Sequence, residues 1–182
     1  MSYPTVSLGD GLQTSAQGFG AMALTPVYGG IDPQGALRTL RHAIDAGVTF
    51  IDTANVYGQG SNEELIAGLL RDRRDEITLA TKFGIVGNPA AGDPATRGDP
   101  DYVRQCIDES LRRLGTDRVD LYYLHRLDPA TPIEETVTRP FRSRRFRASG
   151  RSGVATSRLR WCRLPRSSSS ASFLMHPLVV GS

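Results

Sequence analysis

Four side chains capable of acid–base chemistry lie at or just after the ends of apolar runs. Asp52 lies at the end of the run at 48–53, Lys82 directly follows 77–81, His125 directly follows 119–124, and Tyr57 lies in the loop after Asp52. A carboxylate where an apolar run stops is a helix cap or part of a site. Glycines at 58 and 60 separate Asp52 from the next helix signal, which favours a site.

Lys82 is the only lysine in a chain that contains 21 arginines. A sequence with this preference is expected to use arginine wherever a plain positive charge suffices. A lysine ammonium is compact and its pKa responds to its surroundings, whereas an arginine guanidinium stays charged, so the two are not interchangeable in a chemical role. One lysine must fall somewhere, but most surface lysines lie on helices, so its place at a strand end favours a chemical role.

The four residue types together suit the protonation of an oxygen. A free tyrosine has a pKa of about 10, and a neighbouring cation favours its phenolate form. An aspartate keeps a lysine charged and oriented, and a histidine can hold a substrate oxygen against the phenol. Such a site protonates an oxygen on which negative charge develops. Carbonyl reduction by hydride from a cofactor is such a reaction.

Each of these residues also has a plain structural interpretation. Tyr57 would then be a loop aromatic covering the sheet, His125 a hydrogen-bonded histidine at a strand end, and Asp52 a turn former. The structural interpretation must hold for all three residues at once if there is no site.

The elements that would position these residues alternate between strand and helix. Residues 4–18 predict a hairpin with its turn at Gly9–Gly11. The expected strands are 18–24, 48–53, 77–81 and 119–124, with a long loop at 84–98. The expected helices begin at Asp32–Pro33, at a Ser61/Glu64 capping box, at Asp99–Pro100 and at Pro132. Alternation of this kind predicts parallel strands, whose carboxyl ends share one face.

Length and composition set broad limits on the class of protein. The chain has 182 residues, enough for one medium domain with a core. No run approaches the roughly 18 apolar residues of a membrane helix, and the N-terminus shows no secretory pattern. Cys106 and Cys162 form neither a metal-binding nor a redox spacing, so we expect a cytoplasmic protein without a metal site.

Charge divides the chain into two parts. Residues 1–138 have a net charge of −7, whereas 139–182 contain 10 arginines, no acid and 10 of the 15 serines. The sequence therefore predicts an ordered domain at 1–138 and a poorly structured basic tail at 139–182.

Several segments together resemble the aldo-keto reductases. They are Gly18-Phe19-Gly20-Ala21-Met22, Asp52 to Gly58, Asn62-Glu63-Glu64-Leu65, Thr81 to Gly84 and Asp120 to Arg126. Over residues 3–137 the resemblance implies an eight-stranded (β/α) TIM barrel closed by an N-terminal hairpin. It implies reduction of an aldehyde or ketone, a small-molecule carbonyl substrate, with NADP(H).

The resemblance also implies the roles of individual residues. Tyr57 would be the proton donor, Lys82 and Asp52 would tune its acidity, and His125 would orient the substrate. Gly20, Met22 and Asp52 would lie at the nicotinamide end of the cofactor.

The match to the family pattern stops after Val137, whereas a full barrel needs about 250 residues. We therefore expect a partial barrel of about four βα units, with barrel edges through which copies could associate. An arginine- and serine-rich stretch without acids is what an out-of-frame reading of a GC-rich gene would give, and reading the other frames near codon 138 tests this.

Three alternatives to catalysis by this chain remain open. One is an inactive truncated product, and another is a binding module that keeps the site without catalysis. In the third, the basic tail binds nucleic acid or another acidic surface, but its aromatic residues are sparse and no recognition motif accompanies them, so a nucleic-acid partner is not favoured.

Overall fold

A computed structural model describes residues 3–8, 12–26, 32–88 and 92–138 of the chain. The predicted basic tail at 139–182 and the predicted turn at Gly9–Gly11 lie outside these residues. None of the helices in the described ranges combines the length and apolar character needed to cross a bilayer.

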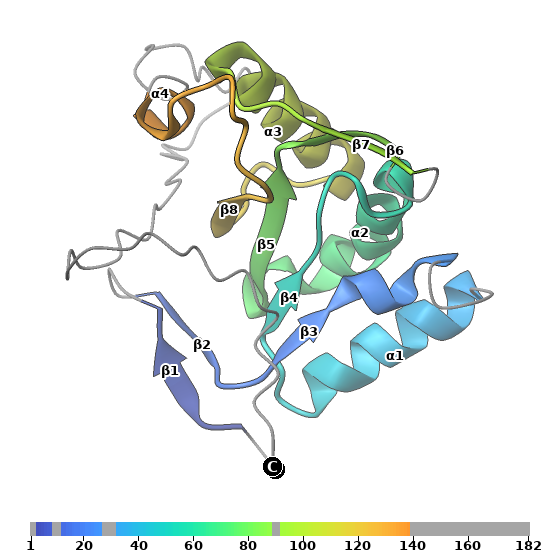
Figure 1. Cartoon of the computed structure of the whole chain (residues 1–182). Helices are drawn as coiled ribbons and strands as arrows, with labels where there is room; N and C mark the ends of the chain where they lie inside the picture. Colours follow the sequence, from blue (N-terminus) through green and yellow to red (C-terminus); the bar gives the residue numbers. More distant parts are fainter. Residues whose placement is uncertain (1–2, 9–11, 27–31, 89–91, 139–182) are drawn as a thin grey trace, which may run out of the picture.

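The centre of the fold is a four-stranded parallel sheet (Figure 1). Its strands, in spatial order, are β3 (Gly18–Gly20), β4 (Phe50–Asp52), β5 (Thr78–Phe83) and β8 (Leu121–Leu124). This order follows the chain, and the sheet has the strand–helix connectivity predicted for part of an α/β barrel.

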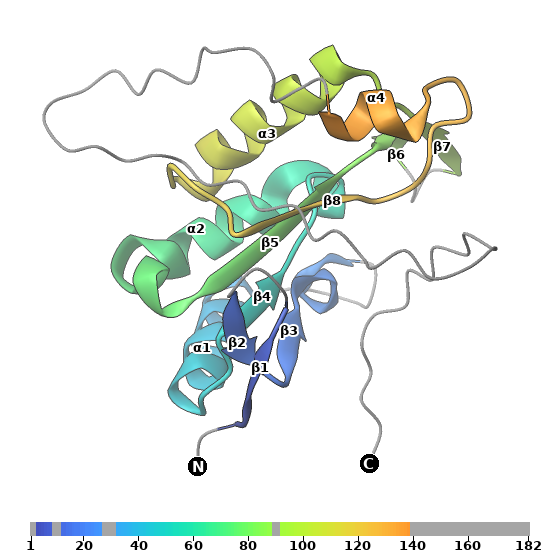
Figure 2. The ribbon, with the colours of Figure 1, turned by 90° about the vertical axis from the view of Figure 1, so that its left-hand side faces the viewer.

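Helices pack along one face of this sheet, and α2 contacts both α1 and α3 (Figures 1 and 2). The helices on this face are α1 (Pro33–Asp45), α2 (Ser61–Arg73) and α3 (Pro100–Leu114), whereas the short α4 (Ile133–Thr138) contacts α3. The core between helices and sheet includes Leu40, Ile51, Ile66, Leu79 and Phe83. Burial of each large apolar side chain contributes about 1.5–3 kcal/mol.

Both Asp-Pro helix starts are confirmed. Asp32 accepts hydrogen bonds from the amides of Gln34 and Gly35, and Asp99 accepts one from the amide of Tyr102. A carboxylate in this position satisfies amides that have no partner within the helix.

The predicted capping box is wrong. The residue before α2 is Gly60, with φ +96°, and Ser61 is already helical. The Ser61 hydroxyl donates to the carbonyl of Gly58 and caps no amide of α2. The chain passes from the short 3₁₀ helix η3 (Tyr57–Gly60) directly into α2, so the position that a capping side chain would occupy requires a left-handed backbone.

The strand expected at 18–24 is shorter than predicted. It ends at Gly20, and Ala21–Leu24 form a 3₁₀ turn, η1. Two side chains hold this turn. Asn62 of α2 donates to the carbonyl of Ala21 at 2.8 Å, and Thr25, directly after the turn, donates to that of Met22 at 2.6 Å.

The segment expected as a loop at 84–98 contains two short antiparallel strands, β6 (Ile85–Asn88) and β7 (Asp93–Thr96). The predicted N-terminal hairpin is confirmed as β1 (Thr5–Ser7) paired with β2 (Gln13–Ser15).

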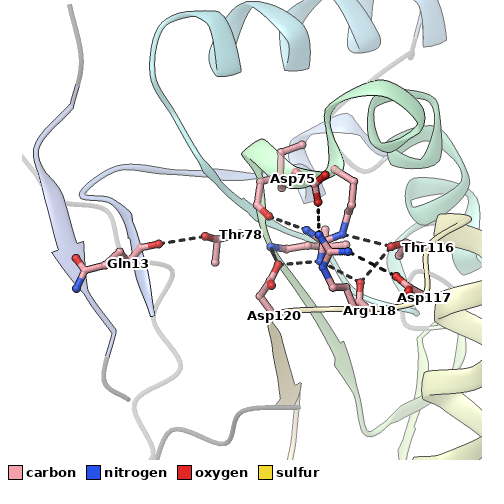
Figure 3. A network of polar contacts seen from close by, with 10 residues as sticks. Gln13, Asp75, Thr78, Thr116, Asp117, Arg118 and Asp120 are labelled. Carbon is pink, nitrogen blue, oxygen red and sulfur yellow. Dashed lines mark hydrogen bonds and ion pairs between the residues drawn. The ribbon is translucent and has the colours of Figure 1, made fainter. Parts of the chain in front are cut away.

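A polar network binds the elements together at the amino end of the sheet (Figure 3). The guanidinium of Arg74, in the 3₁₀ turn η4 (Arg74–Glu76), donates to the carboxylate of Asp120 at 2.9 Å and to the carbonyl of Arg118 at 3.1 Å. Thr78 donates to the carbonyl of Gln13 and so joins β5 to the hairpin. This end of the sheet is stabilised by fixed structural contacts, and the predicted site lies at the other end.

Candidate active site

Lys82 lies at the centre of the candidate site, as the penultimate residue of β5. Its side chain is 10% exposed. Its ammonium donates to the carboxylate of Asp52 at 2.7 Å, to the carbonyl of Thr53 at 2.8 Å and to Oη of Tyr57 at 3.1 Å. An ammonium has three N–H donors, so each has an acceptor.

The register of the sheet explains the contact between Asp52 and Lys82. Asp52 is paired with Ala80 on the neighbouring parallel strand. Lys82 lies two residues further along β5, so its side chain leaves the same face of the sheet. Burial raises the pKa of Asp52, and the adjacent ammonium of Lys82 counteracts this effect.

Tyr57 begins η3, immediately beyond the loop that follows β4. Its oxygen accepts from Lys82, and the Lys82 nitrogen lies 4.6 Å from the centre of its ring. The backbone turns sharply after it, with Gly58 at φ +55° and Gln59 at φ +54°. Because the phenol oxygen acts as an acceptor towards Lys82, the phenol proton remains available to another group.

His125 directly follows β8 and completes the cluster. Its amide donates to the carbonyl of Phe83 at 2.6 Å, which extends the pairing of β5 with β8. Its ring lies edge-on to that of Tyr57, with ring centres 5.7 Å apart. Burial, together with the positive charges of Lys82 and Arg126, lowers the pKa of His125 to about 4. The imidazole is therefore neutral at neutral pH.

One polar atom of this cluster has no protein partner. Nδ1 of His125 is buried and forms no hydrogen bond with any residue that the structure describes. Buried polar atoms normally have a partner, so this nitrogen is a candidate contact for a ligand.

Gly20 and Met22, predicted to lie at the cofactor, are at the end of the neighbouring strand. Gly20 is paired with Asp52 across β3 and β4. A Cβ atom added to Gly20 would meet nothing within 4 Å, so there is open space beside Asp52. Met22 lies half-buried on η1, directly beyond β3.

The structure thus brings Asp52, Tyr57, Lys82 and His125 together at the carboxyl end of the sheet. Sequence reasoning missed the carbonyl of Thr53, which is the third acceptor for Lys82. It also missed that Asn62 and Glu63 are buried polar residues behind the site. In the described ranges no cluster of His, Cys, Asp and Glu side chains is suited to holding a metal ion.

The family model described as "Aldo/keto reductase family" matches residues 17–139. The chain belongs to the aldo-keto reductase family. Among curated relatives, "Aldo-keto reductase yakc [NADP(+)]" from Schizosaccharomyces pombe is 44% identical over 137 residues, covering 74% of this chain and 40% of the relative. "Probable aldo-keto reductase 1" from Glycine max is 43% identical over 135 residues, covering 72% of this chain and 39% of the relative.

Solved aldo-keto reductases share the fold. The chain is similar to "aldo-keto reductase AKR11C1 from Bacillus halodurans (holo form)", with a TM-score of 0.66 and 35% sequence identity. The match covers 74% of this chain and 44% of that structure. By the coverages given above, this aldo-keto reductase chain spans about 40% of the length of the curated relatives it matches.

Proposed function

We propose that the protein is an oxidoreductase that reduces the carbonyl group of a small aldehyde or ketone with NADP(H). The observation that carries this proposal is the set of three hydrogen bonds from Lys82, one of which ends on the Tyr57 oxygen beside His125. Family membership and a relative whose name includes NADP(+) support the same reaction class.

In the proposed reaction Tyr57 gives its proton to the substrate oxygen. The positive charge of Lys82, 3.1 Å from the phenol oxygen, stabilises the negative charge that this oxygen acquires. Asp52 and the Thr53 carbonyl hold the ammonium in place. Neutral His125 donates one hydrogen bond to the substrate carbonyl and orients it.

Gly20, Met22 and Asp52 are the residues we propose to hold the nicotinamide end of the cofactor. The open space beside Gly20, next to its strand partner Asp52, would leave room for the nicotinamide group. When bound, NADPH supplies the hydride. The described residues that line the site supply the proton and the orientation.

We also propose that the ordered domain comprises residues 1–138 and that the protein is cytoplasmic. The free thiol of Cys106 is in keeping with a reducing compartment.

We further propose that two copies associate through the outer strands of the sheet. The outer strands of the parallel sheet are β3 and β8. Analytical ultracentrifugation over a range of concentrations tests association, and a monomer at every concentration contradicts it.

Titration of the purified full chain with NADPH, followed by fluorescence, tests the cofactor proposal, with circular dichroism to follow melting. We expect saturable binding and a cooperative transition. A cooperative melt without NADPH binding contradicts the proposal, and it favours the alternative of an inactive product with the family's fold.

Tyr57→Phe is the matched variant for the chemical step, because it removes only the phenol oxygen. We expect unchanged NADPH affinity and about 10²–10⁴-fold slower reduction of model aldehydes. Equal turnover by the variant and the parent would remove Tyr57 from the mechanism.

A further inference from the structure

Two consecutive polar residues in the first turn of α2 are buried behind the site. Asn62 is 1% exposed and Glu63 is 0% exposed. A buried carboxylate is costly unless it is paired and hydrogen-bonded. The hydrogen-bond partners of these two side chains therefore indicate why these buried positions are occupied by polar residues.

Glu63 joins α2 to β5 and to α3. One carboxylate oxygen accepts from the hydroxyl of Thr81 at 2.6 Å, and the other accepts from Nε of Arg113 at 2.7 Å. The side chain of Arg113 packs against Gly60. A Cβ atom added to Gly60 would lie only 2.7 Å from Cδ of Arg113. Arg113 of α3 thus fixes the position of the Glu63 carboxylate, and the carboxylate in turn fixes Thr81 near the carboxyl end of β5.

Asn62 makes the equivalent connection to the residue directly after β4 and to η1. Its side-chain oxygen accepts from the hydroxyl of Thr53 at 2.7 Å. Its amide nitrogen donates to the carbonyls of Ala21 at 2.8 Å and Leu24 at 3.3 Å. One side chain therefore fixes the residue after Asp52 and also the turn that contains Met22.

Both threonines are the immediate neighbours of site residues. Thr81 precedes Lys82 and Thr53 follows Asp52. Successive side chains of extended backbone leave opposite faces, so the threonines face α2 while Lys82 and Asp52 face the site. The carbonyl of Thr53 is also an acceptor of the Lys82 ammonium.

We propose that Asn62 and Glu63 are positioning residues that set the geometry of the Lys82–Asp52–Tyr57 cluster from the opposite face of the sheet. Hydrogen bonds fix direction as well as distance, whereas apolar packing would allow the two strand ends to slide relative to each other. The catalytic meaning of this arrangement depends on the proposed function, but its effect on Lys82 does not.

The single lysine makes the test direct. In the full chain labelled with ¹⁵N-lysine, the side-chain ammonium signal belongs to Lys82 alone. We expect Glu63→Gln to shift this signal and to speed exchange of its protons with water, because Thr81 and Arg113 lose their shared carboxylate. Thr81→Ser keeps the hydroxyl and should keep the parental signal.

Glu109→Gln is the matched control. Glu109 also pairs with Arg113, at 3.5 Å, but its side chain lies on the surface of α3 and is 43% exposed. The same change of charge there should leave the Lys82 signal in place.

A folded Glu63→Gln variant with a lower melting temperature but an unmoved Lys82 signal overturns the proposal, since the residue would then be only structural. If Glu63→Gln does not fold, Thr53→Val is the second variant, because it removes the hydroxyl that donates to Asn62 beside Asp52. An unmoved Lys82 signal in folded Thr53→Val then overturns the proposal in the same way. A parent chain without a protected ammonium signal also overturns it. Neither cofactor nor substrate is present, so failure to bind NADPH leaves this test intact.

Discussion

Replacement of His125 by glutamine should change how the stability of the protein depends on pH. The pKa of His125 is lowered from 6.5 to about 4 by burial, by Lys82 and by Arg126. Between these two values the unfolded chain binds a proton that the folded chain does not. The free energy of unfolding of the parent therefore falls as the pH falls from 6.5 to 4.

The magnitude follows from the size of the shift. A lowering from 6.5 to about 4 corresponds to about 3 kcal/mol, at about 1.4 kcal/mol for each tenfold change in proton affinity. His125 is only partly buried, so solvent screening reduces the expected contribution to about 1–2 kcal/mol.

Urea denaturation of the parent and of His125→Gln, at several values between pH 4 and pH 7, measures this contribution. The carboxylates titrate in both proteins, so the difference between the two curves isolates His125. We expect the variant to lose about 1–2 kcal/mol less than the parent over this range. His42→Gln, which removes an exposed histidine of α1, is the control and should follow the parent. Parallel curves for His125→Gln and the parent would refute the reasoning.

Three further predictions concern stability, each measured by urea denaturation. Arg74→Met should cost about 2–4 kcal/mol, because Asp120 loses its ion-pair partner at the amino end of the sheet; a loss no larger than that of a surface substitution would contradict this. Gly60→Ala should cost about 1–3 kcal/mol, because φ is +96° and a Cβ would collide with Arg113; an unchanged midpoint would argue against the packing described. Asp32→Ala should cost about 1 kcal/mol through loss of the α1 cap, with Asp45→Ala at the other end of the helix as control.

The parts of the fold that sequence reasoning found are those that local patterns determine. An Asp-Pro pair satisfies the first amides of a helix without help from distant residues, so α1 and α3 begin where predicted. The grouping of the candidate residues could be predicted because parallel strands bring their carboxyl ends to one face. Asp52, Lys82 and His125 therefore had to be neighbours once their strands were assigned.

The parts that sequence reasoning missed depend on contacts between distant segments. Ser61 and Glu64 have the spacing of a capping box, yet packing of Arg113 over Gly60 and the tight turn before α2 determine the helix start. Glu63 has the appearance of an ordinary charged helix residue. Only its tertiary partners, Thr81 and Arg113, reveal a buried carboxylate.

The spatial order of the parallel strands has a consequence for synthesis on the ribosome. Because β3, β4, β5 and β8 lie side by side in the order of the chain, each emerging strand can add to the outer side of those already made. The Lys82–Asp52 pair can form while His125 is still inside the ribosome. The strand order therefore allows the residues of the candidate site to be brought together by successive additions, each strand pairing with one that is already made.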